Sequence, residues 1–466
     1  MKQTSENALE IAIKNYSSYG KYVAMGRAYP NIKDGCKSAY KRAIYGMYKE
    51  GNGNIVKCAK LASYALPYHP HPSSISGVIV QLGNDGNKLK LMKTQGNWGN
   101  SRMKISASAD RYIGGALSEL AEKLLCDSVK YARMVRGEID EYEPVALPAL
   151  LPLCFINGSN GIPSGLPILN IPTIDITDMI NYYIEILKNK SLDYKPSWYP
   201  KPNLELDIIS TKKDWNSLME SGKGSIRVAP VMSIENGVIT ILNMPSSKTI
   251  DSIYQILSNE INSDKINVRD ESTSNIKVVI EKVPRKQCNM NEIYQRLYKK
   301  LQSSISYNMA FFDEEKIYVP CGFHKVVIEN LKYLIETHDN RIKIQIDNLN
   351  NKLLVLQIIE KMKKNKDVIK LASMNNQEAI KFIIGKYKVQ DVTAKEVLQK
   401  PISYLTKEHG DELERLDNSI SELNRDREDI YDFLLRKYKD LKKYINPIIK
   451  NKYLKSNFVK QVKNLE

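Results

Sequence analysis

The strongest pattern in the sequence is a regular spacing of apolar residues in its last third. One series recurs every seven residues and a second follows three-four spacing. The first contains Ile328, Ile335, Ile342, Leu349 and Leu356, and the second Leu413, Leu416, Ile420, Leu423, Ile430 and Leu434. Both spacings put apolar side chains along one stripe of a helix. We expect two long helices that form an antiparallel coiled coil and enclose a helical segment at about 366–405. An ordinary helical bundle is the alternative.

In the middle third, apolar and polar residues alternate in the way that is typical of β-strands. After a Pro-rich stretch (DYKPSWYPKPN), the segments SIRVAPV, VITILNM and NIKVVIEKV alternate apolar and polar residues, and MNEIYQRLYKKL has a helical pattern. Residues from about 185 to 320 are therefore expected to form an α+β domain.

The first third combines short helical patterns with glycine-rich turns. The helix-like segments are Glu6–Tyr16, Gly35–Lys49, Ile55–Leu66 and Ser74–Leu82. Short helices followed by loops and small strands suit a winged helix-turn-helix module. The expected fold class is thus α+β and multidomain.

Charge narrows the possible partners. The 466 residues carry a formal net charge of +16, which indicates an anionic partner unless the chain simply comes from a Lys-rich proteome. The segment from Lys33 to Lys60 contains seven basic residues but only two acidic ones. A local excess of this kind suits a phosphate-facing surface.

Other features favour nucleic acid over a membrane as that anion. The N-terminus has no apolar signal core, and the apolar stretch 145–156 is interrupted by Pro148 and Pro152. Six dispersed cysteines without a CxxC pair argue against a zinc site and fit a reducing compartment. We expect a soluble protein of the cytoplasm with no membrane partner.

Several motifs offer candidate chemistry, each with a plainer alternative. In RAYPNIKDGCKSAYKR, Asp34 is placed to cap the next helix, and Lys37, Lys41 and Arg42 share one helical face that could contact phosphate or only solvent. In YHPH, His69 and His71 could contact phosphate or serve the structure.

Two further segments hold a candidate nucleophile and a candidate wedge. Arg111 and Tyr112 follow a run of small residues, but Tyr112 is one of 28 tyrosines. In NGSNGIPSGLPILNIP, Ile171 could be an apolar wedge that enters a DNA base step, or a buried loop residue.

The order of these motifs is more specific than any one of them. R-A-x-P-x-x-x-D-G-x-K, Y-H-P-H, Q-G-N-W-G, R-Y, N-G-x-x-G-I and N-I-P follow one another over about residues 19–180. This succession resembles the breakage-reunion region of type IIA DNA topoisomerases, which include the A subunits of gyrase and topoisomerase IV and eukaryotic topoisomerase II. The chain looks most like the medium subunit of the phage T4-type enzyme.

The resemblance implies a role for each motif. Tyr112 would form a 5′-phosphotyrosyl link, and Arg111 beside it would stabilise the scissile phosphate. Arg27, Lys37 and His71 would supply further cations, and Ile171 would intercalate and bend the gate DNA. The implied DNA contacts are Lys33, Lys41, Arg42, His69, Ser74 and Ile171. Asp110, directly before Arg111, departs from the family pattern and puts a negative charge beside the phosphate.

The resemblance also implies the domain layout. It predicts a winged-helix DNA-cleavage domain (1–184), a tower domain (185–322), a coiled coil (323–445) with a dimerisation tip at about 366–405, and a basic tail (446–466).

The partners implied are double-stranded DNA, a second copy of the chain, and a separate ATPase/Toprim subunit. That subunit would hold Mg²⁺ and ATP, since this chain offers no metal site of its own. Two alternatives stay open: a non-catalytic architectural DNA-binding protein, and a coiled-coil scaffold with a basic head.

Overall fold

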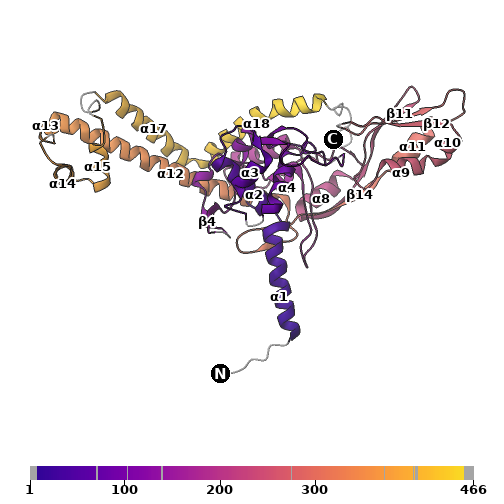
Figure 1. Ribbon diagram of the computed structural model, residues 1–466, viewed down its shortest axis with the longest axis horizontal. Coiled ribbons are helices and arrows are strands. Elements are labelled where there is room, and N and C mark those ends of the chain that lie inside the picture. The colour runs from indigo at the N-terminus through magenta and orange to yellow at the C-terminus, as the bar shows by residue number, and fades with distance from the viewer. Residues whose placement is uncertain are drawn as a thin grey trace. The chain divides into compact units, whose positions relative to one another are not determined.

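The computed structural model describes residues 8–69, 72–101, 103–137, 140–273, 275–371, 373–401, 404 and 408–455. The chain divides into two units, which are described separately. One comprises Met1–Leu334 with Lys437–Glu466, and the other comprises Ile335–Arg436. The chain is a mixed α/β protein with long helices and small sheets (Figure 1).

The first unit opens with a group of helices. These are α1 (Ala8–Val23), the π-helical turn η1 (Ala24–Ala28), α2 (Ser38–Glu50), α3 (Cys58–Ala65) and α4 (Pro72–Gly83). The predicted helices are therefore present, with α1 extending further than expected. Helices α2 and α3 cross closely at Gly46, where a Cβ would lie 2.3 Å from the Tyr64 carbonyl oxygen. Only glycine permits that approach.

A three-stranded antiparallel sheet follows these helices. It has the order β1-β3-β2 and consists of β1 (Val56–Lys57), β2 (Met92–Gln95) and β3 (Gly114–Leu117). Trp98 is fully buried against it, and its indole N–H donates to the carbonyl oxygens of Gln95 and Gly114, both at 3.2 Å. The indole thus fixes the start of β3, the central strand.

A five-stranded sheet joins distant parts of the sequence. Its order is β6-β7-β14-β9-β8. The strands are β6 (Ser159–Gly161), β7 (Leu169–Ile171), β8 (Asp207–Ile208), β9 (Lys223–Ala229) and β14 (Ser303–Asn308), with α7 (Ile176–Lys188) and α8 (Lys212–Ser221) nearby in sequence. Along β9, Ile226 and Val228 are buried while Ser225 and Arg227 are exposed, so one face packs inward.

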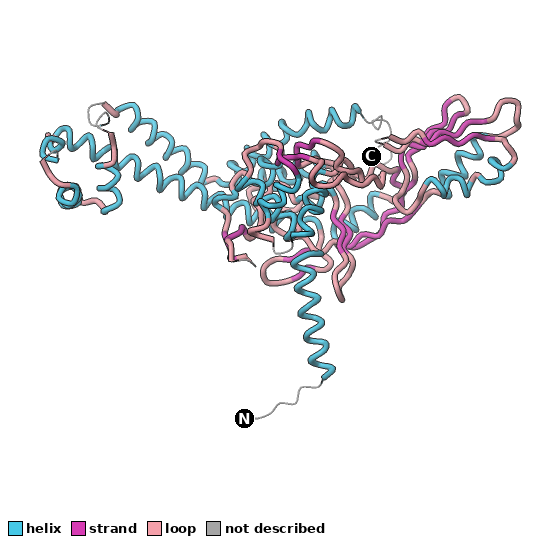
Figure 2. Tube along the Cα trace, viewed as in Figure 1, coloured by secondary structure: helices cyan, strands magenta, loops and turns pink. Residues whose placement is uncertain are grey.

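A four-stranded sheet carries the predicted alternating strands. Its order is β10-β11-β13-β12, with β10 (Val231–Glu235), β11 (Val238–Asn243), β12 (Ile266–Asp270) and β13 (Val278–Lys282). Figure 2 shows helices running beside these strands: α9 (Ile250–Ile256), α10 (Ser258–Asn262) and α11 (Met290–Lys300). Ile239, Ile280 and Leu297 lie in the shared core.

Shorter elements complete the first unit. They are α5 (Glu119–Ala121), η2 (Glu122–Cys126), η3 (Val129–Tyr131), β4 (Met134–Arg136), β5 (Tyr142–Pro144), α6 (Leu153–Asn157), β15 (Phe311–Phe312) and β16 (Ile317–Tyr318).

The heptad region is helical throughout most of its length. The long helices are α12 (Phe323–Lys364), α17 (Gly410–Glu428) and α18 (Ile430–Lys455), and the predicted helical segment contains α13 (Asp367–Leu371), α14 (Asn376–Tyr387) and α15 (Asp391–Leu398). The second long helix is interrupted at Asp429, whose backbone is not helical. The stripe residues Leu413, Leu416 and Ile420 are half-buried. None of the helices in the described ranges is both long and apolar enough to cross a membrane.

Candidate nucleic-acid interface

Tyr112 lies on an exposed turn at the edge of the three-stranded sheet. Its backbone N–H closes the turn onto the Ala109 carbonyl oxygen at 2.8 Å, and 64% of the residue is exposed. The next residue, Ile113, is fully buried and leads into β3. The Arg111 guanidinium lies over the Tyr112 ring, 4.8 Å from its centroid. A cation and a phenol are therefore presented together on a turn whose base is fixed in the core.

Asp110, on the same turn, is half-buried. Burial and, to a smaller extent, the charge of Asp110 raise the pKa of the Cys58 thiol to about 12. The Asp110 carboxylate is therefore close enough to influence the Cys58 thiol, while Arg111 and Tyr112 are both exposed.

Arg27 and Lys37 gather around a second element, the β6–β7 hairpin. Lys37 precedes α2, and its ammonium donates a hydrogen bond to the Asn160 carbonyl oxygen on β6. Burial lowers the pKa of this lysine. Arg27 is exposed on η1, which packs directly on β6, because a Cβ at Gly161 would lie 2.2 Å from the Ala28 oxygen. The predicted residues thus form two groups, one on the Tyr112 turn and one on this hairpin.

The predicted DNA contacts at Lys41 and Arg42 are wrong. Lys41 and Arg42 are only 8% and 7% exposed, and both pair with buried Glu143 on β5. Arg42 makes two hydrogen bonds to this carboxylate, at 2.9 and 3.1 Å, and Lys41 also donates to the Pro144 oxygen at 2.7 Å. These cations join α2 to the β4–β5 hairpin instead of facing a ligand.

Lys33 also has an acidic partner, although it is less buried. Its ammonium lies 2.6 Å from the Glu314 carboxylate and over the ring of Tyr333. A phosphate at this position would have to compete with Glu314. A direct DNA contact from Lys33 stays a prediction.

Asp34 does not cap α2 as the sequence suggested. The helix begins after Lys37, whose side chain makes no capping bond. Asp34 is fully buried, and its carboxylate accepts the backbone N–H groups of Cys36 and Leu147, both at 2.8 Å. Burial raises its pKa from 3.8 to about 6, although these hydrogen bonds oppose the shift. It therefore holds a distant loop against the start of α2.

The histidine motif is only partly described. His71 lies outside the described residues. His69 is 7% exposed, and its Nε2 shares a hydrogen bond of 3.0 Å with the Ser74 hydroxyl in the first turn of α4. The burial of His69 contradicts a direct DNA contact and gives it a positioning role. Ser74 is exposed, and its contact with DNA stays a prediction.

Ile171 is not available as a wedge, because it is 2% exposed and points into the core from β7. The exposed apolar residues of this hairpin are Ile162, at 81%, and Ile168, at 64%. Neither isoleucine is among the candidates that the sequence motifs indicated. The available signal was the turn-forming segment IPSGLPI, which puts both isoleucines in a connecting loop, and loops generally lie at the surface.

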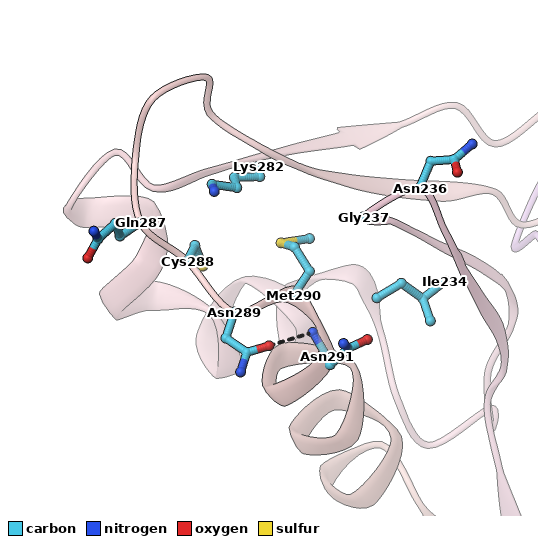
Figure 3. Close-up of a pocket in the computed structure, with 9 residues that line it drawn as sticks. All are labelled: Ile234, Asn236, Gly237, Lys282, Gln287, Cys288, Asn289, Met290 and Asn291. Carbon is cyan, nitrogen blue, oxygen red and sulfur yellow. Dashed lines mark hydrogen bonds between the residues drawn. The ribbon is translucent and has the colours of Figure 1, made fainter.

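A separate open hollow lies at one end of the four-stranded sheet (Figure 3). It measures about 730 Å³ and lies between the β10–β11 turn and the start of α11. Asn289 already accepts the backbone N–H of Asn291 there, at 3.1 Å. Its lining contains none of the predicted site residues. In the described part of the chain, no group of three or more His, Cys, Asp or Glu residues could hold a metal ion.

Comparisons with known proteins agree with the motif order. The sequence profile of the family described as DNA gyrase/topoisomerase IV, A subunit, matches residues 27–449. Similar proteins include the A subunit of DNA topoisomerase 4 from the Staphylococcus aureus strains NCTC 8325 / PS 47, COL and MRSA252. Each is 28% identical over 423 residues, which are 84% of this chain and 52% of the relative. The chain thus spans about half the length of these relatives. The closer likeness to the T4-type medium subunit stays a prediction.

Proposed function

This chain belongs to the family of DNA gyrase/topoisomerase IV A subunits, and from that membership we propose that it is the DNA-cleaving subunit of a type IIA topoisomerase. The observation that carries the proposal is the pairing of an exposed Tyr112 with the Arg111 guanidinium on one anchored turn. In this proposal residues 1–184 are a winged-helix cleavage domain and residues 185–322, with the four-stranded sheet, are the tower. The five-stranded sheet takes strands from both. The long helices form a coiled coil with a dimerisation tip.

The proposed reaction is a reversible transfer of a phosphoryl group. The Tyr112 oxygen attacks phosphorus and loses its proton, while the bond from phosphorus to the 3′ oxygen breaks and that oxygen gains a proton. The broken strand then has a free 3′ hydroxyl on one side of the break and a 5′-phosphotyrosyl ester on the other. Religation is the reverse attack by that hydroxyl, so the ester conserves the broken bond and no ATP is needed for the chemistry.

The cations of this chain would stabilise the negative charge that develops on the phosphate oxygens. Arg111 can donate to those oxygens without moving its backbone, because it already lies beside the phenol. Arg27 and Lys37 would hold the DNA backbone at the β6–β7 hairpin. Bound Mg²⁺, which we assign to the Toprim domain of a partner subunit, would supply further charge stabilisation.

Strand passage needs partners beyond this chain. We assign ATP hydrolysis to the ATPase domain of the same partner subunit. The second copy of the chain would pair through the helical tip, where Ile369 is 73% exposed and Val392 is 62% exposed beside a small apolar core. Replacing both with aspartate should weaken the dimer in sedimentation experiments if the tip is the interface.

The test is denaturant trapping with supercoiled DNA, Mg²⁺ and the ATPase/Toprim partner. Wild-type chain should give covalent protein–DNA adducts, and Tyr112→Phe should give none because the nucleophilic oxygen is missing. Tyr142→Phe is the matched control, since Tyr142 is 62% exposed and lies on β5, in a different sheet from the strand that follows the Tyr112 turn. DNA binding without adducts in the wild-type mixture would instead indicate an architectural DNA-binding protein.

A further inference from the structure

We propose that Asn97 is a positioning residue for Tyr112, and that it acts through the hydrogen bond from its side chain to the Ser106 carbonyl oxygen. The inference rests on the proposed function for the role of Tyr112 as the nucleophile. It goes beyond that function because it gives a residue of the motif Q-G-N-W-G, outside the Tyr112 turn, a part in the rate of strand cleavage.

The backbone on both sides of Asn97 is held in place. Gly96 approaches the backbone of the nucleophile, since a Cβ there would lie 3.3 Å from the Tyr112 carbonyl oxygen. Trp98 is fully buried, and its indole N–H donates to the Gly114 carbonyl oxygen at the start of β3. The side chain of Asn97 is nevertheless exposed. Asn97 therefore extends from a fixed point at the edge of the sheet.

Asn97 makes three hydrogen bonds within the connection between β2 and β3, which has an outgoing branch (97–101) and a returning branch (105–108). Its carboxamide oxygen accepts the Gly99 backbone N–H at 2.9 Å, and its carboxamide nitrogen donates to the Ser106 carbonyl oxygen at 3.2 Å. Its backbone carbonyl oxygen accepts the Ser108 N–H at 3.0 Å. One residue thus joins the two branches.

The returning branch leads directly to the nucleophile. A Cβ at Gly99 would lie 2.8 Å from the Ile105 carbonyl oxygen, so the branches are in close contact there. Ile105 and Asn100 also exchange two backbone hydrogen bonds, at 2.9 and 3.0 Å. Tyr112 follows Ser108 by four residues. A shift of the returning branch would therefore move the turn that carries the phenol.

The bond between Asn97 and Ser106 has more influence on position than on stability. Both residues are exposed, so water can replace the bond and its loss should destabilise the fold little. A nucleophile that attacks phosphorus is far more sensitive, because a misplacement of about 1 Å can lower a rate on the order of 10²-fold. The expected effect of losing the bond is therefore on the rate of cleavage.

The experiment separates the rate of cleavage from the fraction of competent protein. Full-length chain is mixed with Mg²⁺, the ATPase/Toprim partner and a saturating duplex whose 3′-hydroxyl piece is short enough to dissociate after cleavage. Since religation is then prevented, the rate constant of adduct formation reports the chemistry, and the final yield reports the fraction of folded, competent chain. DNA affinity is measured separately, without Mg²⁺.

Three variants are compared with the wild-type chain. Asn97→Ala removes both side-chain bonds, whereas Asn97→Ser keeps an acceptor for the Gly99 N–H but does not reach Ser106. Asn87→Ala is the matched control. Asn87 also makes two side-chain hydrogen bonds, at 2.8 and 3.1 Å, but to carbonyl oxygens at the end of α4.

The proposal expects Asn97→Ala to slow adduct formation on the order of 10²-fold, with the final yield and the DNA affinity unchanged. Asn97→Ser should be slowed to a similar extent, because it also lacks the bond to Ser106. Asn87→Ala should react at the wild-type rate, since its bonds lie outside the connection that carries Tyr112.

A wild-type rate in either Asn97 variant would overturn the proposal, and so would equal slowing in Asn87→Ala. A lower final yield reached at the wild-type rate would show that Asn97 only supports the fold. Weaker DNA binding with a wild-type rate at saturation would make Asn97 a DNA contact, and either result also overturns the proposal. Failure of the proposed function appears differently, because the wild-type chain itself would then form no adducts.

Discussion

Glu143 offers a direct test of how the first unit is held together. Its carboxylate is 4% exposed and accepts two hydrogen bonds from Arg42, with the Lys41 ammonium 3.3 Å away. Glu143→Gln keeps the shape of the side chain but leaves two buried cations without a counter-charge. Breaking a buried ion pair in this way costs about 3–5 kcal/mol, a large share of the roughly 5–15 kcal/mol that stabilises a typical protein.

Hydrogen exchange measures that cost locally. Because each 1.4 kcal/mol is about a tenfold change in an opening equilibrium, peptides from α2 should exchange on the order of 10²-fold to several thousand-fold faster in the variant. Glu281→Gln is the matched control. Glu281 makes the same two-bond contact to Arg269, at 2.7 and 2.8 Å, but at an exposed site. Water can replace that contact, so its loss should change exchange little.

A result within about threefold of wild type for Glu143→Gln would refute the reasoning, because it would mean that the buried cations find other partners or water. A second variant distinguishes the loss of the ion pair itself from the cost of leaving unpaired cations buried. Replacing Lys41, Arg42 and Glu143 together by Met, Leu and Leu should cost far less than Glu143→Gln, since no charge is then left buried.

Three further outcomes are expected. Gly83→Ala should destabilise the protein by about 1–3 kcal/mol and shift Trp98 emission, because its Cβ would lie 2.3 Å from the indole ring; Gly77→Ala, with open space in the same helix, should be neutral or stabilising in thermal unfolding. The pKa of Asp34 is higher in the folded state, so its ionisation lowers the stability of the wild-type protein as pH rises from about 4 to about 6. Asp34→Asn cannot ionise, so the difference in unfolding free energy between wild type and variant should narrow over this range in urea titrations. A difference that stays constant would contradict the shift. Arg111→Ala should lower the yield of covalent adducts on the order of 10²-fold. The slope of log binding constant against log salt concentration should fall by no more than the loss of about one phosphate contact predicts.

Local pattern determined most of the secondary structure. Apolar spacing predicted α12 and the stripe from Leu413 to Leu434, and alternation predicted β9, β11 and β13. These features depend on residues within a few positions of one another, so the sequence carries them directly. The ordered motifs likewise pointed to Tyr112 among many tyrosines, and the structure places it on an exposed turn beside Arg111.

What the charged and apolar side chains face was decided by tertiary structure. Lys41 and Arg42 point inward because Glu143, 101 residues beyond Arg42, supplies a buried counter-charge. Asp34 serves Leu147 instead of the adjacent helix for the same reason, since burial of a carboxylate requires donors that a distant loop provides.

In the β6–β7 hairpin, too, the sequence indicated the segment and the tertiary structure decided which side chains are exposed. The sequence marked the segment from Asn157 to Pro172 as one that could carry an apolar wedge, but it did not show which isoleucine is exposed. Side-chain direction in a strand alternates with every residue, so the register of β6 with β7 buries Ile171 and exposes Ile162 and Ile168. A motif can therefore locate a functional segment, while the pairing of strands selects the side chain that can reach a ligand.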